Sequence, residues 1–302
     1  MDVVAALAAS ATIADLHRAQ FDAENRMTPQ EVAALAAEAA ALPEAARPWI
    51  ARLAGMVRRI RPEPEPYRRR AIAEGVTLFE AEGAPGARRD LVIGFCGEAH
   101  RLMMPVAPVL QAFPAARCDV LVLADASQAN FLLGLPGYAA DPVALATRLS
   151  RDLPLSRYAA LRCFGTSAGG AAALGYGAGL GARVAMSLGG AHPLAMSERR
   201  IQGRDIDRLA FDRAIAAAPP GRTRLLCVHG QKHARDVVRT RLQSIALPGG
   251  RAIAVEGIAQ HGVIAGLFLR DAMVRFFEEM LLSDSPPEGG VWRPAVEASE
   301  RR

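Results

Sequence analysis

Seven short, mostly apolar runs, separated by helical or irregular segments, constrain the fold of this chain more than any other feature. The runs are GVTLFEA, DLVIGFCG, CDVLVLAD, ALRCFGTS, RVAMSLGG, TRLLCVHG and RAIAVEG. Continuous apolar character is typical of strands that are buried on both faces of a parallel sheet. Helical segments between the later runs imply right-handed crossovers. The pattern therefore predicts an α/β fold with a doubly wound, mostly parallel sheet.

The N-terminal part has a different, helical pattern. In TPQEVAALAAEAAAL, Thr28 is placed to cap a helix, Pro29 to open it and Glu31 to complete a capping box. A second helix is expected from about 43 to 60, where the prolines of RPEPEP end it. We therefore expect a helical N-terminal extension over 1–70, an α/β domain over 71–282 and a flexible tail over 283–302. In that tail, Trp292 could hold part of the chain against the surface.

Composition indicates the class of protein. No apolar run reaches the roughly 18 residues of a membrane span, and the acidic start MDVV does not match a signal peptide. These features predict a cytoplasmic protein with no membrane span. The net charge of +5, from 36 basic and 31 acidic residues, is too small to indicate a nucleic-acid partner. The basic runs MVRRIR and YRRRA are interpreted as a solvated helix face and a linker.

The cysteines give no sign of a disulfide framework or a metal site. Cys96, Cys118, Cys163 and Cys227 lie far apart, each inside an apolar run, and no CxxC pair occurs. Reduced, buried thiols are the expected state.

The segment LRCFGTSAGG contains a GxSxG pattern with Ser167 at its centre. Such a pattern places a serine on a strained strand-to-helix turn, and Gly165 and Gly169 leave room for the neighbouring backbone. The amide of Ala168 would then donate to an oxyanion. The alternative interpretation is a purely structural glycine-rich turn that lets a helix pack close to the sheet.

A serine nucleophile needs a general base and an acid that orients the base. Asp236 follows the run TRLLCVHG, and His261 follows RAIAVEG, so both fall at the carboxyl ends of expected strands. The order Ser, Asp, His is the one expected on this kind of sheet. Two alternatives stay open: His261 or Asp236 could merely cap the next helix, and Glu256 is a rival acid.

Five segments together resemble the α/β-hydrolase superfamily, in particular bacterial members of unassigned substrate with a GTSxGG turn. They are GFCGEAHRLMMP, VLADASQANFLLGLPGY, GTSAGGAAALGYGAG, HGQKHARD and GIAQHGV. The resemblance covers roughly 75–282 and leaves the N-terminal helices unexplained. It implies a sheet of the α/β-hydrolase type and assigns Ser167, Asp236 and His261 to the triad. FCGEAH stands where many esterases have an HGGG loop.

By analogy with this layout, the second oxyanion donor comes from the loop after LVIGFCG. The amides of Gly97 and Glu98 are the candidates. His100 and Arg101 would either touch substrate or cap a helix, and His192 would line the cleft or satisfy its own loop.

No cofactor or metal is expected. His229 and His233 are four residues apart, but Gly230 and a strand end argue against one helical face, and no HExxH occurs. GYGAGLG ends a helix instead of opening one, and no GxxxxGK loop is present.

The leading hypothesis is a serine esterase or thioesterase that forms an acyl-enzyme on Ser167, with a small-molecule or carrier-attached acyl substrate. An acyltransferase with the same triad and a non-catalytic binding module are the alternatives. The acyl group, the leaving group, the oligomeric state and the role of the N-terminal helices stay open.

Overall fold

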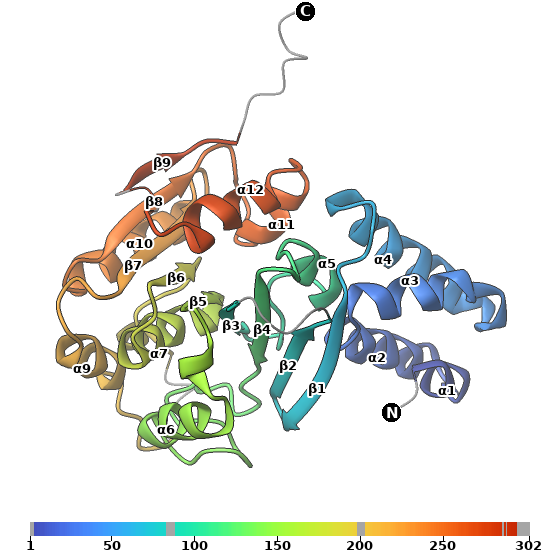
Figure 1. Ribbon diagram of the computed structural model, residues 1–302, viewed down its shortest axis with the longest axis horizontal. Coiled ribbons are helices and arrows are strands. Elements are labelled where there is room, and N and C mark those ends of the chain that lie inside the picture. Colours follow the sequence, from blue (N-terminus) through green and yellow to red (C-terminus); the bar gives the residue numbers. More distant parts are fainter. Residues whose placement is uncertain (1–2, 83–87, 198–202, 286, 288, 295–302) are drawn as a thin grey trace, which may run out of the picture.

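A computed structural model of the protein describes residues 3–82, 88–197, 203–285, 287 and 289–294. Over these residues, nine strands form one sheet with helices on both faces (Figure 1). The strands are β1 (Tyr67–Ala73), β2 (Val76–Ala81), β3 (Asp90–Phe95), β4 (Cys118–Leu123), β5 (Ala160–Thr166), β6 (Val184–Leu188), β7 (Arg224–Gly230), β8 (Arg251–Val255) and β9 (Gly290–Trp292). Their order across the sheet is β1-β2-β4-β3-β5-β6-β7-β8-β9.

The sheet is mostly parallel. Strand β2 pairs antiparallel with both β1 and β4, and every other neighbouring pair is parallel. All seven predicted runs form strands, β2 to β8. Strands β3, β4 and β6 are buried along their whole length, which explains why they appear in the sequence as continuous apolar runs. The predicted doubly wound α/β fold is confirmed.

The helices cover the sheet in two layers. On one face lie α5 (Val106–Gln111), α11 (Val263–Phe268), α12 (Met273–Phe277) and the π-helical segment η6 (Glu278–Leu282), with the core between them and the sheet. On the other face lie α6 (Pro142–Asp152), α7 (Gly170–Leu180), α9 (Ala210–Ala217) and α10 (Ala234–Ala246). Each layer buries the alternate side chains of the same strands, so the sheet is covered on both sides.

The N-terminal helices form a unit beside β1 and α5 (Figure 1). They are α1 (Val3–Ala8), α2 (Ile13–Glu24), α3 (Pro29–Ala37) and α4 (Arg47–Ile60). The capping box at the start of α3 is present, because Thr28 and Glu31 each accept the other's backbone N–H. The unit has its own apolar cluster, which also includes Ala107 of α5. The N-terminal helices therefore pack against the helix that follows β3.

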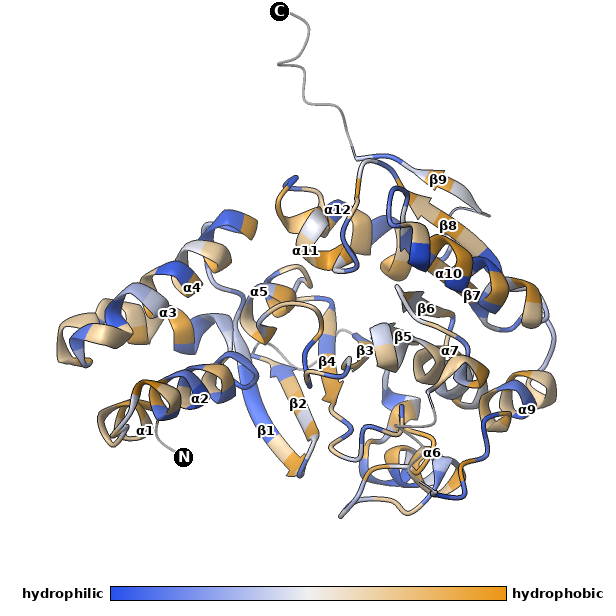
Figure 2. Ribbon diagram, turned by 180° about the vertical axis from the view of Figure 1, so that it is seen from behind, coloured by the Kyte–Doolittle hydropathy of each residue, from blue (hydrophilic) through white to orange (hydrophobic). Residues whose placement is uncertain are grey.

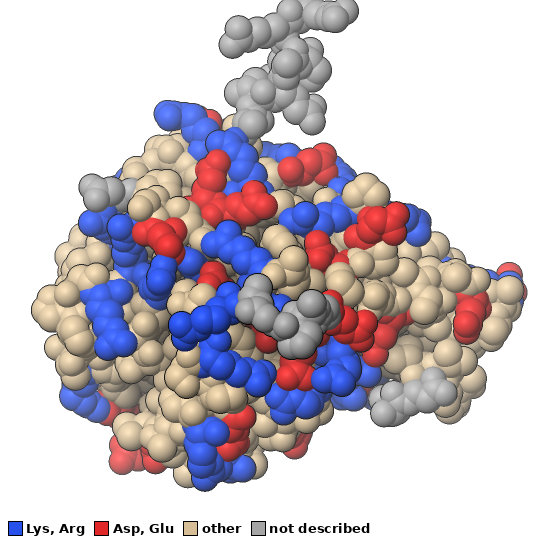
Figure 3. Space-filling view, in the orientation of Figure 1, with Lys and Arg blue, Asp and Glu red and all other residues tan. Residues whose placement is uncertain are grey.

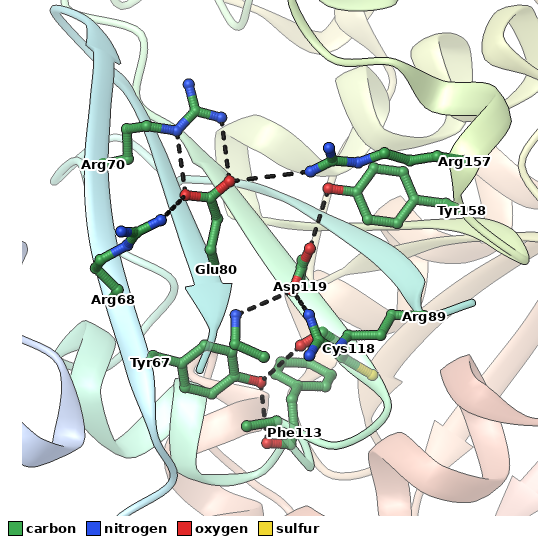
Figure 4. A network of polar contacts seen from close by, with 12 residues as sticks. Tyr67, Arg68, Arg70, Glu80, Arg89, Phe113, Cys118, Asp119, Arg157 and Tyr158 are labelled. Atoms are coloured by element: carbon green, nitrogen blue, oxygen red, sulfur yellow. Dashed lines mark hydrogen bonds and ion pairs between the residues drawn. The ribbon is translucent and has the colours of Figure 1, made fainter. Parts of the chain in front are cut away.

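Strand β1 is a correction to the sequence analysis. It contains YRRRA, which was interpreted as a linker, and it crosses the expected boundary between residues 70 and 71. As an edge strand with β2 as its neighbour, it needs no apolar run, and Figure 2 shows it as hydrophilic. Arg68 and Arg70 both bond to Glu80 of β2 (Figure 4). Cross-strand ion pairs therefore take the place of apolar contacts along this edge.

Strand β9 corrects the expectation of a flexible tail at residues 290–292 and confirms the expectation that Trp292 holds part of this segment against the surface. It pairs with β8, and its Trp292 is 4% exposed. The indole N–H of Trp292 donates to Glu279 at 2.7 Å. Part of this segment is thus fixed to the sheet edge, while residues 295–302 of the expected tail lie outside the described residues.

The surface carries charges of both signs, and the four cysteines are buried. On the face seen in Figure 3, basic and acidic side chains are interleaved. Among the described residues, no helix has the length and apolar character needed to cross a bilayer. All four cysteines are buried and unpaired, and burial raises the pKa of each thiol to about 12.

Candidate active site

Ser167 occupies a tight turn between the end of β5 and the start of α7. Its φ of 50° lies in the left-handed region, which a non-glycine residue adopts only under constraint. A Cβ on Gly165 would lie 2.0 Å from the carbonyl oxygen of Gly169, and a Cβ on Gly169 would lie 2.4 Å from that of Phe95. Both flanking glycines are therefore required by close backbone contacts, as the GxSxG pattern predicts.

Three side chains from different strand ends meet at this turn. His261 Nε2 lies 2.9 Å from Ser167 Oγ, and His261 Nδ1 lies 2.7 Å from Asp236 Oδ2. In the neutral tautomer that fits both contacts, Nδ1–H donates to the carboxylate and Nε2 accepts from the serine hydroxyl. A structural glycine turn alone gives no reason for a histidine and a buried carboxylate to line up behind the serine.

Asp236 is fully buried in the first turn of α10, whereas the His261 side chain is 40% exposed. The rival acid Glu256 is 45% exposed and forms an ion pair with Arg293 at 3.6 Å. The carboxylate that bonds to His261 is thus the one following β7. Burial of Asp236 with a charge-assisted bond to the imidazole favours a fixed ring orientation.

Two neighbours of the triad are not apparent from the sequence. His233 caps α10 by accepting the Asp236 amide at 3.3 Å, and the same Nδ1 lies 3.1 Å from Asp236 Oδ2. Gly189 follows β6 with a φ of 58°, and a Cβ there would lie 3.2 Å from His261 Cε1 and 3.3 Å from Asp236 Oδ2. The glycine pair after RVAMSL only weakly indicates a close contact with the triad, since glycine pairs are common in loops.

A cavity of about 610 Å³ opens over Ser167. Its lining includes charged groups on α10, Arg235 and Arg239, beside the smaller side chains of the loop after β6. The lining residues are Glu98, Ser167, Ala168, Gly189, Ala191, His192, Ala195, Met196, Ser197, His233, Arg235, Asp236, Arg239 and His261. The reacting serine therefore faces a solvent-accessible space large enough for a small acyl group.

Of the three residues expected to donate to an oxyanion, two line the cavity and one does not. Ala168 and Glu98 line the cavity with Ser167. The amide of Gly97 instead donates to the carbonyl of Arg101 at 2.8 Å, so in this conformation it does not face an oxyanion. This corrects the assignment of Gly97, and the physical reason is a tight turn in the loop after β3.

Of the expected substrate-binding residues, the structure brings His192 alone to this cavity. Its Nε2 lies 3.0 Å from Asp212 and its Nδ1 accepts the Leu194 amide, so it also orders its own loop. His100 and Arg101 do not line the cavity. The Arg101 side chain is directed to the N-terminal helices, which corrects its assignment to substrate.

Two further histidines, His229 and His233, lie near the triad. His229 is buried at the end of β7, and burial, aided by the charge of Arg241, lowers its pKa despite the opposing effect of Asp236. The cluster that could hold a metal ion among the described residues is His233, Asp236 and His261, whose ligand atoms lie within 4.8 Å of one another. Two of these side chains, Asp236 and His261, also form the hydrogen-bonded chain to Ser167. The absence of a bound metal stays a prediction.

The strand order and the placement of these residues define the class. Two antiparallel pairs at one edge, a serine turn after β5, an acid after β7 and a histidine after β8 are the features of the α/β-hydrolase fold. The protein has the α/β-hydrolase fold, and the resemblance stated from the sequence is confirmed at that level.

Comparisons with known proteins found solved structures to which this chain is similar. No protein-family model and no curated protein matches the sequence. Dienelactone hydrolase from Anabaena variabilis is 18% identical, with 71% of this chain and 99% of that chain covered and a TM-score of 0.43. The 2,6-dihydroxy-pseudo-oxynicotine hydrolase is 14% identical at a TM-score of 0.48, and the match covers 90% of this chain and 85% of that chain. Enterobactin esterase from Shigella flexneri is 13% identical at a TM-score of 0.45, and the match covers 70% of this chain and 59% of the esterase.

Proposed function

We propose that this protein is a serine hydrolase that cleaves an ester or thioester through an acyl-enzyme on Ser167. The observation that carries the proposal is the continuous chain from Ser167 Oγ through the His261 ring to Asp236, with contacts of 2.9 and 2.7 Å. A serine hydroxyl is a weak nucleophile at neutral pH unless a base accepts its proton. The same chain supplies that base and fixes its tautomer.

The proposed acylation step uses this geometry. Ser167 Oγ attacks the acyl carbonyl carbon while its proton passes to His261 Nε2, and the carbonyl oxygen becomes an oxyanion. The amides of Ala168 and Glu98 would stabilise that charge, together with the N-terminus of α7, which begins at Gly170 just after the serine turn. The bond to the leaving group then breaks, and His261 returns the proton to the leaving alkoxide or thiolate.

Deacylation repeats these roles with water. His261 accepts a proton from the water that attacks the acyl-serine carbonyl. The bond to Ser167 Oγ breaks, the oxygen recovers its proton from His261, and the free acid leaves. The asymmetry between a buried Asp236 and a partly exposed His261 suits this cycle, because the acid stays fixed while the base meets solvent.

The test is hydrolysis of p-nitrophenyl esters and acyl thioesters by the full-length chain and its variants. Ser167→Ala and His261→Ala should abolish turnover, and Asp236→Asn should lower kcat on the order of 10⁴-fold because the wrong imidazole tautomer is held. Glu256→Gln is the matched control, since this exposed carboxylate pairs with Arg293, and it should retain wild-type kcat. Turnover that survives in Ser167→Ala would contradict the proposal.

A further inference from the structure

The loop between β3 and α5, residues 96–105, lies directly against the nucleophile turn. The carbonyl of Arg101 accepts two hydrogen bonds, from the Gly97 amide at 2.8 Å and from the Thr166 hydroxyl at 3.1 Å. Thr166 immediately precedes Ser167, and a Cβ on Gly97 would lie 3.1 Å from the Thr166 carbonyl oxygen. The backbone of Arg101 therefore ties the loop with Glu98 to the turn with Ser167.

The side chain of Arg101 extends the other way, into the N-terminal helices. Its Nη2 lies 2.5 Å from Glu24 Oε2, and its guanidinium lies 3.8 Å from the centre of the Phe21 ring. Glu24 and Phe21 both belong to α2, 77 residues or more before Arg101 in the chain. One residue thus bonds to the nucleophile turn through its backbone and to α2 through its side chain.

Glu24 is itself fixed by a third element. It is 8% exposed, and its Oε1 accepts the indole N–H of Trp49 of α4 at 2.8 Å. Arg52, whose side chain is 70% exposed, lies 3.8 Å away from the same oxygen. A buried carboxylate is stable only when it is paired and hydrogen-bonded, and Arg101 is its closest cationic partner among the described residues.

The loop needs such support, because its backbone is strained. His100 has a φ of 55° and Met103 a φ of 64°, both in the left-handed region. Non-glycine residues persist there only where surrounding contacts over-determine the conformation. Arg101 lies between these two residues, and the helix that follows the loop, α5, packs on the N-terminal unit through Ala107.

We infer that Arg101 and Glu24 are positioning residues through which the N-terminal helices hold the loop of residues 96–105 in the conformation that stabilises the oxyanion. The inference rests on the proposed function, in which the Glu98 amide of this loop stabilises the oxyanion. It assigns the helices a role in the chemical step, although none of their residues lines the catalytic cavity. Loss of one oxyanion donor typically costs about 10²- to 10³-fold in kcat, so a loosened donor should cost about 10- to 100-fold.

Two substitutions test the inference in the full-length chain. Glu24→Gln keeps an oxygen for Trp49 and removes the charge that holds Arg101. Arg101→Met leaves the backbone bonds possible and removes the guanidinium. Both should lower kcat for a p-nitrophenyl ester about 10- to 100-fold with KM changed less than about twofold, because the contact acts on the transition state. The affinity for a boronic acid that mimics the tetrahedral intermediate should fall in parallel with kcat.

Two controls separate positioning from simple destabilisation. Arg52→Ala removes the exposed partner of Glu24 and should leave kcat unchanged. Val32→Ala opens a cavity in the apolar cluster of the N-terminal unit, which contains no residue of 96–105, and should lower Tm with kcat retained. Wild-type kcat in Glu24→Gln and Arg101→Met would overturn the inference. So would a fall in kcat in Val32→Ala that equals theirs at the same loss of Tm.

Hydrogen exchange distinguishes a failure of this inference from a failure of the proposed function. Amides of residues 96–105 should exchange faster in Glu24→Gln than in the wild type, while those of β6 and β7 should not change. Unchanged exchange in the loop would overturn the inference whether or not the protein turns over esters. If the wild type shows no Ser167-dependent turnover, the proposed function fails, and the exchange data still decide whether Glu24 holds the loop.

Discussion

Arg162 offers the sharpest test of how the fold is stabilised. It lies on β5 with 2% of its side chain exposed, and its Nε donates to Asp90 of β3 at 2.7 Å. The same guanidinium donates to the carbonyls of Leu281 and Ser283 and to the carboxylate of Asp284. Arg162 therefore joins two central strands to the chain that follows α12.

Substitution Arg162→Met removes these four hydrogen bonds and leaves the buried carboxylate of Asp90 with Arg117 at 3.7 Å as its cationic partner. Removing one member of a buried ion pair costs about 3 to 5 kcal/mol, because the remaining charge stays desolvated. For 302 residues the unfolding entropy is about 0.6 kcal/mol per degree, so a loss of 4 kcal/mol lowers Tm by about 6 °C.

The assay is thermal and urea unfolding followed by circular dichroism. Arg183→Met is the matched control, because Arg183 pairs with the same Asp284 at 2.6 Å but is 52% exposed. An exposed pair contributes about 0 to 1 kcal/mol, so Tm should fall by less than about 2 °C. A loss in Arg162→Met no larger than that in Arg183→Met would refute the reasoning.

The buried thiols, the buried His229 and the close contact at Gly189 each have a measurable consequence. Burial raises the pKa of all four thiols to about 12, so Ellman's reagent should react with none of them in the native protein and with four after denaturation; fast reaction of a native thiol would contradict their burial. The pKa of His229 is lowered, chiefly by burial, so its contribution to stability is complete above the unfolded pKa of about 6.5 and is lost as pH falls toward the folded value. His229→Asn should therefore flatten the pH dependence of the unfolding free energy below about pH 6.5, and an unchanged slope would exclude this residue. Gly189→Ala should lower kcat about tenfold or more in a folded protein, because its Cβ would press on His261 and Asp236; wild-type kcat would show that the triad tolerates the shift.

The central strands were predictable from the sequence, and the edges were not. Strands β2 to β8 are covered by helices or neighbouring strands, and their buried positions are occupied by apolar residues that form recognisable runs in the sequence. Strand β1 lies at the sheet edge and can carry three consecutive arginines, which in a sequence look like a linker. Strand β9 has three residues and is defined by its pairing with β8, a contact between distant segments.

The site residues that directly follow the ends of strands were predictable from the sequence. Ser167, Asp236 and His261 were placed by the order of the strands, and the structure brings them within hydrogen-bonding distance. The direction of the Gly97 amide was not accessible, because it depends on left-handed backbone at His100 that no residue type in FCGEAH marks. The pairing of Arg101 with Glu24 was also not predictable, because the two residues are 77 positions apart in the sequence.

Labelling with a fluorophosphonate probe, mapped by mass spectrometry, tests the central claim most directly, since the probe forms a covalent adduct with an activated serine. The account predicts one covalent adduct on Ser167 in the wild type, lost in Ser167→Ala and in His261→Ala while both variants remain folded. A folded wild-type protein that does not label, or that labels at another residue, would contradict the account and leave the turn after β5 with a structural role.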